Sequence, residues 1–144
     1  MKHIEEVKRA AAALKVPLDG LDAAAYARLI SAIKHKYVDG RRHGCFLWER
    51  LMDFAAVTDE RGWSYLKDFI GDRACVLLLD PSETGGAVLP NGEALDRVLG
   101  DCYGFEIYVT DWETDYLLCV NHHDGLMGCG KAKTWVEEIC LKRD

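Results

Sequence analysis

The sequence predicts an α+β fold in which a small antiparallel β-meander is packed with N-terminal helices and a C-terminal helix. Apolar residues recur at helical spacing through the first 70 positions. The pattern then changes to a continuous apolar run at 75–79 and to strand-like segments at 105–110 and 116–120. Because helices bury an apolar stripe and sheets bury an apolar face, we expect the helices to pack on the sheet.

The length and composition of the chain favour one folded α+β domain that spans residues 1–144. A chain of 144 residues with 49% hydrophobic and 29% charged residues has the size and balance of a single globular unit. The formal net charge is −6, and an acidic surface repels phosphate backbones, so we expect no direct contact with nucleic acid. The same charge suits a basic protein partner.

The cysteines and the N-terminal residues favour a cytoplasmic location. No C-x-x-C pair is present and several cysteines stand in apolar stretches, so we expect them to be reduced and mostly buried. They are Cys45, Cys75, Cys102, Cys119, Cys129 and Cys140. Residues 1–6 do not resemble a signal peptide, and no apolar run approaches the roughly 20 residues of a membrane span. We therefore expect no membrane association.

The N-terminal half predicts four helices. Their apolar stripes cover 4–14, 20–37, 47–55 and 63–70. Pro17 is expected to end the first helix, since proline cannot continue a helical hydrogen-bond pattern. The other predicted boundary residues are Asp19 and Thr58 as N-caps and Gly71 as a C-terminal stop.

The C-terminal half predicts a meander and two further helices. Strands are expected at 75–79, 105–110, 116–120 and 126–129, with a loop at 82–91 and turns at 111–114 and 121–125. The helices are expected from Asn91, as an N-cap, to Gly100 and from Lys131 onward. In the second strand Phe105, Ile107 and Val109 share one face while Glu106, Tyr108 and Thr110 share the other.

The segment Asn121-His122-His123-Asp124 carries the residue types of a catalytic or metal site. Two imidazoles and a carboxylate can move protons near neutral pH, which makes His122, His123 and Asp124 candidate catalytic residues. Cys119 with the two histidines would form a candidate metal site. The favoured interpretation is a polar turn in which Asn121 and Asp124 bond the local backbone and Gly125 supplies a positive φ, so we expect no cofactor.

Cys129 is a further candidate catalytic residue, which would act as a nucleophile. It stands between Gly128 and Gly130 just before the last predicted helix, where a thiol pKa can be lowered. The sequence 125–132 also falls short of a phosphate-binding loop, because Ala132 occupies the position that requires Ser or Thr. Nucleotide hydrolysis is therefore excluded.

The turn between the second and third predicted strands is acidic and aromatic. Asp111, Glu113 and Asp115 surround Trp112 at the tip of the expected hairpin. Carboxylates steer a basic partner and a tryptophan can anchor it, so these four residues are the candidate partner-binding residues. The alternative is a solvated turn whose tryptophan folds back onto the sheet. Three carboxylates on an exposed turn are expected to be dispensable for stability.

Several C-terminal segments resemble a family of small uncharacterised bacterial proteins. They are Asn91-Gly92, Tyr103 to Asp111, Tyr116 to Asp124, Gly128 to Ala132 and Trp135, with Leu47-Trp48-Glu49 and Leu79-Asp80 upstream. The segment Asn121 to Asp124 is the most specific of these. The family supplies no activity to carry over, but small acidic bacterial proteins of this kind resemble immunity proteins, which neutralise toxins. By analogy we expect a protein-binding module, and more specifically a protein that occludes the basic active site of a toxin domain.

Overall fold

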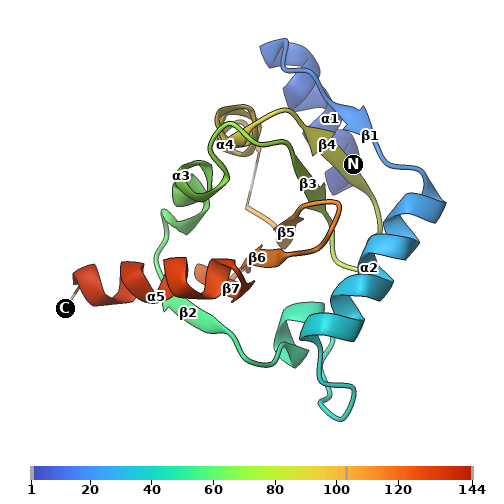
Figure 1. The fold of residues 1–144 in the computed structure, drawn as a ribbon. Helices are drawn as coiled ribbons and strands as arrows, with labels where there is room; N and C mark the ends of the chain where they lie inside the picture. The colour runs from blue at the N-terminus through green and yellow to red at the C-terminus, as the bar shows by residue number, and fades with distance from the viewer. Residues whose placement is uncertain (1, 103, 144) are drawn as a thin grey trace.

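The structure, a computed structural model, describes residues 2–102 and 104–143 and contains a seven-stranded antiparallel sheet (Figure 1). The strand order is β1-β4-β3-β5-β6-β7-β2. The strands are β1 (Asp19–Gly20), β2 (Ala55–Thr58), β3 (Cys75–Leu78), β4 (Gly86–Leu89), β5 (Ile107–Thr110), β6 (Tyr116–Val120) and β7 (Gly125–Gly130). The predicted α+β class with a β-meander is therefore confirmed, and the meander is β5-β6-β7.

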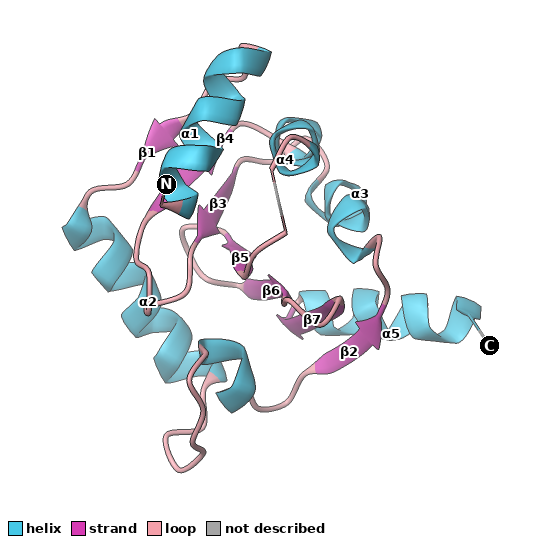
Figure 2. Ribbon diagram, turned by 180° about the vertical axis from the view of Figure 1, so that it is seen from behind, coloured by secondary structure: helices cyan, strands magenta, loops and turns pink. Residues whose placement is uncertain are grey.

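Helices cover both faces of the sheet (Figures 1 and 2). They are α1 (His3–Leu14), α2 (Ala23–Tyr37), α3 (Leu66–Ile70), α4 (Gly92–Gly100) and α5 (Ala132–Arg143), with short 3-10 helices η1 (Leu47–Arg50) and η2 (Gly62–Tyr65). One core packs α1, α3, α4 and α5 on the sheet, and a second core packs α2 and η1 on the opposite face. The molecule is thus a three-layer arrangement around one sheet.

The strands alternate between the two cores, so both of their faces are buried. Within β3, Cys75 and Leu77 point to the α1 side while Val76 and Leu78 point to the α2 side. The predicted alternation of the second strand is confirmed, because Ile107 and Val109 pack in the α1-side core and Tyr108 in the α2-side core, and all four residues of β5 are buried. The covering helix α2 makes this burial possible.

Several predicted boundaries are confirmed and others shift. Asn91 caps α4 by accepting a hydrogen bond from the Ala94 N–H. Asp19 is not a helix cap: it lies in β1, and Asp22 caps α2 instead. The predicted loop at 82–91 is also too long, because its second half forms β4 between β1 and β3.

The predicted helix at 47–55 is wrong and breaks into two elements. Only η1 is helical, because Leu51 is already extended and Asp53 has a φ of 51°. The chain then enters β2, which pairs with β7. Thr58 therefore ends a strand and does not cap a helix. This pairing also moves β7 from the edge of the sheet to its interior.

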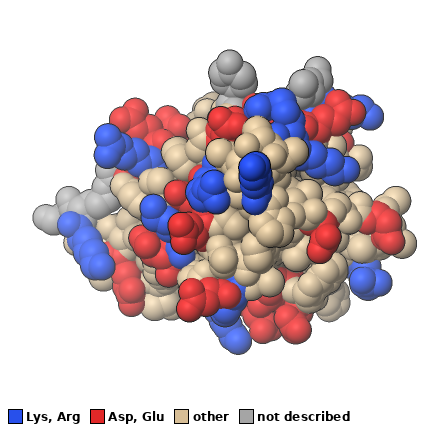
Figure 3. Space-filling model, turned by 90° about the horizontal axis from the view of Figure 1, so that it is seen from above, with Lys and Arg blue, Asp and Glu red and all other residues tan. Residues whose placement is uncertain are grey.

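Neither a membrane-spanning helix among the described residues nor a large patch of one charge on the face drawn in Figure 3 is seen. No helix in the described part of the chain combines the length and the apolar character needed to cross a bilayer. On the face shown in Figure 3, Lys and Arg side chains are interspersed with Asp and Glu, so the negative net charge is not concentrated there.

Candidate functional site

Two turns with candidate residues lie at opposite ends of β6. The turn from β5 into β6 holds residues 111–115, which we call the acidic tip, and the turn from β6 into β7 holds residues 121–124, which we call the histidine turn. Since β6 has five residues and a strand rises about 3.4 Å per residue, the two turns are roughly 15 Å apart. They are therefore separate sites.

The backbone of the acidic tip is fixed by local hydrogen bonds. The Asp115 N–H donates to Asp111 Oδ1 at 2.9 Å, and the Thr110 hydroxyl donates to the Tyr116 carbonyl at 2.6 Å. Thr114 adopts a left-handed conformation with a φ of 51° and is buried. Asp111 is thus a structural residue of the turn as well as a surface charge.

The end of α2 also holds the acidic tip. Lys36 Nζ donates to the carbonyls of Glu113 and Thr114 at 2.8 and 3.1 Å, and the Tyr37 hydroxyl donates to the Thr114 carbonyl at 2.7 Å. Burial, together with the charges of Cys129, Asp115 and Asp111, raises the pKa of Tyr37 to about 12, so its hydroxyl remains a donor at neutral pH. These contacts leave the tip little freedom to move.

The side chains of the acidic tip point mostly to solvent. Trp112 is 48% exposed and Glu113 is exposed, so the tryptophan does not fold back fully onto the sheet. Asp115 lies 3.4 Å from Lys131 Nζ, but the lysine side chain is 72% exposed and water screens the pair. The structure therefore gathers the four predicted partner-binding residues on one turn.

The histidine turn depends on Asn121, as the sequence predicts. This side chain is buried, and its Oδ1 accepts hydrogen bonds from the N–H groups of His123 and Gly125, both at 2.9 Å. The expected positive φ falls on a different residue, because Asp124 has a φ of 60° and Gly125 does not. Gly125 is needed for space instead: an added Cβ would lie 2.7 Å from the Asn121 amide nitrogen.

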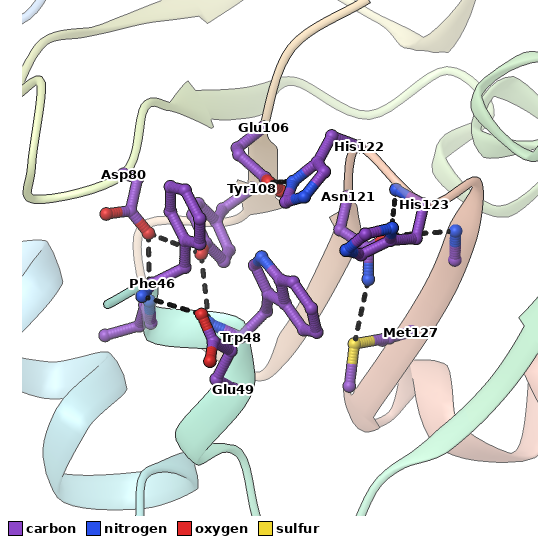
Figure 4. Close-up of polar contacts among 12 residues, drawn as sticks. Phe46, Trp48, Glu49, Asp80, Glu106, Tyr108, Asn121, His122, His123 and Met127 are labelled. Carbon is purple, nitrogen blue, oxygen red and sulfur yellow. Dashed lines mark hydrogen bonds and ion pairs between the residues drawn. The ribbon is translucent and has the colours of Figure 1, made fainter. Parts of the chain in front are cut away.

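Two aromatic rings pack against the two histidines (Figure 4): Phe46, directly before η1, and Trp48, within η1. The Trp48 ring lies edge-on to both imidazoles, with centroid distances of 6.1 Å to His122 and 6.0 Å to His123. Phe46 approaches His122 at 5.5 Å, and the two imidazole centroids are 3.9 Å apart. The histidines are therefore packed side by side and do not converge on a common ligand.

A buried hydrogen-bond network holds η1, which carries Trp48, in place. The sequence analysis did not predict this network. Asp80 Oδ1 accepts from the Leu47 N–H at 2.9 Å and from the Tyr108 hydroxyl at 2.7 Å, while the Trp48 N–H donates to the Tyr108 oxygen at 3.1 Å (Figure 4). Burial and the nearby Asp80 raise the Tyr108 pKa far above its ordinary value. The only sequence signal was a carboxylate directly after the apolar run of β3.

The two candidate cysteines are buried. Cys129 lies within the α2-side core, and its burial raises the thiol pKa to about 12, which disfavours the alternative in which it acts as a nucleophile. Cys119 is likewise buried, with a pKa well above the ordinary value. Among the described residues no three His, Cys, Asp or Glu side chains are placed to hold a metal ion, so Cys119, His122 and His123 do not form the alternative metal site.

The other cysteines differ in exposure, and all six are free of disulfide bonds. Cys75 is buried, Cys102 and Cys140 are partly buried, and Cys45 is exposed. Buried thiols are thus half of the total. The expectation of mostly buried cysteines holds only when the partly buried ones are included.

One polar contact of the histidine turn joins an imidazole to a carboxylate. His122 Nδ1 contacts Glu106 Oε1, and the imidazole is 45% exposed. Glu106 Oε2 is buried and accepts no hydrogen bond from the described residues, and Trp48 Nε1 is a buried donor in the same situation. Of the predicted catalytic set, only His122 therefore gains a carboxylate partner.

Comparisons with known proteins give no further guide to this site. No protein-family model, no curated protein and no solved structure matches the chain. The resemblance to small bacterial proteins remains an expectation, and the function must be argued from the geometry of the two turns.

Proposed function

We propose that the protein is a protein-binding module that engages a basic partner through the acidic tip. The observation that carries this proposal is Trp112, a large aromatic side chain that is 48% exposed on a turn whose backbone is hydrogen-bonded on both sides. Exposed tryptophans are frequent anchors of protein interfaces. A turn that is already ordered loses little conformational freedom on binding, which favours affinity.

The charges around Trp112 support a basic partner. Lys36 is occupied by two backbone carbonyls, and Lys131 makes only a solvent-screened contact with Asp115. Glu113 and Asp115 are thus available to attract a cationic surface, within a chain whose formal net charge is −6. Rim charges of this kind mainly raise the rate of association, while the aromatic anchor slows dissociation.

A more specific form of the proposal is that the partner is a toxin domain whose active site the acidic tip occludes. Toxins that act on nucleic acid need basic clefts, and an acidic surface competes with the phosphates for such a cleft. The resemblance to small bacterial proteins and the negative net charge support this form. The same surface chemistry would serve any partner with a basic groove.

Photo-crosslinking in the native host tests the proposal. A crosslinkable amino acid replaces Trp112 in one variant and Leu141 in a control, because Leu141 on α5 is also an exposed apolar side chain at 73%. We expect a specific adduct from position 112 and none from position 141, with a basic protein in the adduct. Equal adducts from both positions, or none from position 112, would contradict binding at the acidic tip.

A further inference from the structure

A groove of about 740 Å³ lies beside α2, between this helix and the turn that joins β3 to β4. Leu21, Tyr26 and Ile30 give it an apolar lining, and Thr84 and Gly85 line it from the turn. The core on this side of the sheet is covered by α2 and η1, whereas α1, α3, α4 and α5 cover the opposite face (Figure 2). The α2 layer is therefore the thinner of the two, and the groove is an open space beside its one long helix.

The exposed residues that α2 contributes to the middle of the groove have small side chains. Ala23, Ala27 and Ser31 follow one another at intervals of four residues, which places them in a row along one face of the helix. Two helices whose contact residues are small can approach until their axes are about 8 Å apart. The groove therefore has the form of a surface against which another helix can pack.

The two charged residues that line the groove lie at its opposite ends. Asp22 caps the N-terminus of α2, and Lys34 lies in the last turn of the helix, roughly 18 Å away at 1.5 Å per residue. Asp22 Oδ1 accepts a hydrogen bond from the Ala25 N–H, but the carboxylate forms no ion pair with the described residues. The Lys34 ammonium has neither a hydrogen bond nor an ion pair within the same part of the chain. Each end of the groove is therefore free to meet a charge of the opposite sign.

These charges define the kind of helix that fits the groove. A helix that lies antiparallel to α2 brings its own N-terminus beside the C-terminus of α2, so the two macrodipoles attract each other. To match Asp22 and Lys34 it must carry an acidic residue at its N-terminus and a basic residue about three turns later. A copy of α2 in the reverse direction meets both requirements, and its own Ala23, Ala27 and Ser31 permit the close approach.

We propose that the groove beside α2 is the interface of a homodimer, in which α2 of a second copy lies antiparallel to α2 about a twofold axis. A twofold interface requires one surface that is complementary to itself. In this arrangement Asp22 of each copy meets Lys34 of the other, so a single packing forms both ion pairs. The interface does not use the acidic tip, and the proposal is independent of the binding function assigned to that tip.

The test is sedimentation velocity of the purified chain at concentrations from about 1 μM to about 1 mM, where a conversion of monomer to dimer is expected. Ala27→Arg places a long, charged side chain in the middle of the row and should raise the dissociation constant about tenfold or more. Ala12→Arg is the matched control, because Ala12 is an exposed alanine on α1, on the opposite face of the sheet. This variant should dimerise as the wild type does.

A second pair of variants tests the direction of the helices. Lys34→Glu should weaken the dimer, since it faces Asp22 of the other copy with a like charge. Asp22→Asn keeps an oxygen for the helix cap and removes the charge, so it should weaken the wild-type dimer but strengthen the Lys34→Glu dimer. A wild-type chain that stays monomeric at every concentration would overturn the proposal and leave the groove to a helix of another protein. A dimer that Ala27→Arg does not weaken more than Ala12→Arg, or an Asp22→Asn effect of the same sign in both backgrounds, would also overturn it.

Discussion

The acidic tip and the histidine turn close the two ends of the same strand in opposite ways. At the acidic tip, side chains of α2 donate hydrogen bonds to backbone carbonyls of the turn, and Trp112 and Glu113 are exposed. At the histidine turn the buried Asn121 side chain holds the backbone, and the imidazoles pack against Trp48. Both turns carry exposed side chains, Trp112 and Glu113 at one and His122, His123 and Asp124 at the other, but the backbone of the histidine turn is held by the buried Asn121 side chain.

This difference separates residues that matter for folding from residues that are free to serve binding. Substitutions behind the histidine turn should cost stability, because they remove buried hydrogen bonds. Substitutions at the acidic tip should leave stability almost unchanged, because exposed side chains contribute little. Four changes, from the largest expected effect to the smallest, test this contrast.

Alkaline pH should have the largest effect, and it acts on the core behind both turns. Burial raises the thiol pKa of Cys75 and of Cys129 from about 9 to about 12. The folded state therefore holds these protons more tightly than the unfolded state, so their contribution is complete below pH 9 and is lost as pH rises from 9 to 12. Denaturant titrations at pH 8, 9.5 and 10.5 should show a falling free energy of unfolding. Cys129→Ala, compared with wild type, should reduce the slope, and an unchanged slope would mean that this thiol ionises freely in the folded protein.

Tyr108→Phe should give the largest effect of a single hydroxyl. Its loss removes the hydrogen bond to Asp80 and leaves the Trp48 N–H without its acceptor, which costs about 2–3 kcal/mol. Tyr37→Phe is the matched control at the acidic tip, where the lost bond to the Thr114 carbonyl is half-buried and costs about 1 kcal/mol. Chemical denaturation measures both values. A larger effect at Tyr37 would reverse the contrast between the two turns.

Asn121→Ala should have the next largest effect, a loss of stability at the histidine turn. Two backbone N–H groups lose their acceptor, which costs about 2 kcal/mol and lowers the melting temperature by several degrees for a chain of this size. Asn121→Asp keeps the accepting oxygen and should lose less. Calorimetry of the two variants decides: if alanine is tolerated as well as aspartate, the side chain does not hold the turn.

Neutralising the outer carboxylates of the acidic tip should have the smallest effect on stability. Glu113→Gln with Asp115→Asn should change the free energy of unfolding by less than about 0.5 kcal/mol, because Glu113 is exposed and Asp115, whose side chain is 41% exposed, makes only a water-screened ion pair. Asp111 is an exception to the expectation that all three carboxylates are dispensable, since Asp111→Ser removes the acceptor of the Asp115 N–H. Melting temperatures of the double variant and of Asp111→Ser should therefore differ.

The sequence predicted local features well and the contacts between distant segments poorly. The turn at 111–115 and the role of Asn121 could be predicted because each has hydrogen bonds between residues a few positions apart, whereas the contacts of Lys36 and Tyr37 with the acidic tip span 77 positions and were missed. The Asp80 network could not, because Tyr108 lies 28 positions from Asp80 and 60 from Trp48. Periodicity reports burial and does not identify the partner that buries a residue.

The helix predicted at 47–55 was misassigned because contacts with distant segments decide the structure of these residues. Its apolar spacing suits a helix, but the segment is used as a 3-10 turn under the histidines followed by a strand that pairs with β7. Tertiary pairing overrides local spacing in such cases. Cys129 is enclosed for a related reason, because pairing with β2 places β7 inside the sheet.

Binding kinetics of the partner identified by crosslinking test the central claim most directly. Immobilised partner is exposed to wild type, Trp112→Ala and the Glu113→Gln/Asp115→Asn variant at two salt concentrations. We expect Trp112→Ala to raise the dissociation rate, and the charge variant to lower the association rate and to weaken its dependence on salt. Wild-type rates for both variants would contradict binding through the acidic tip.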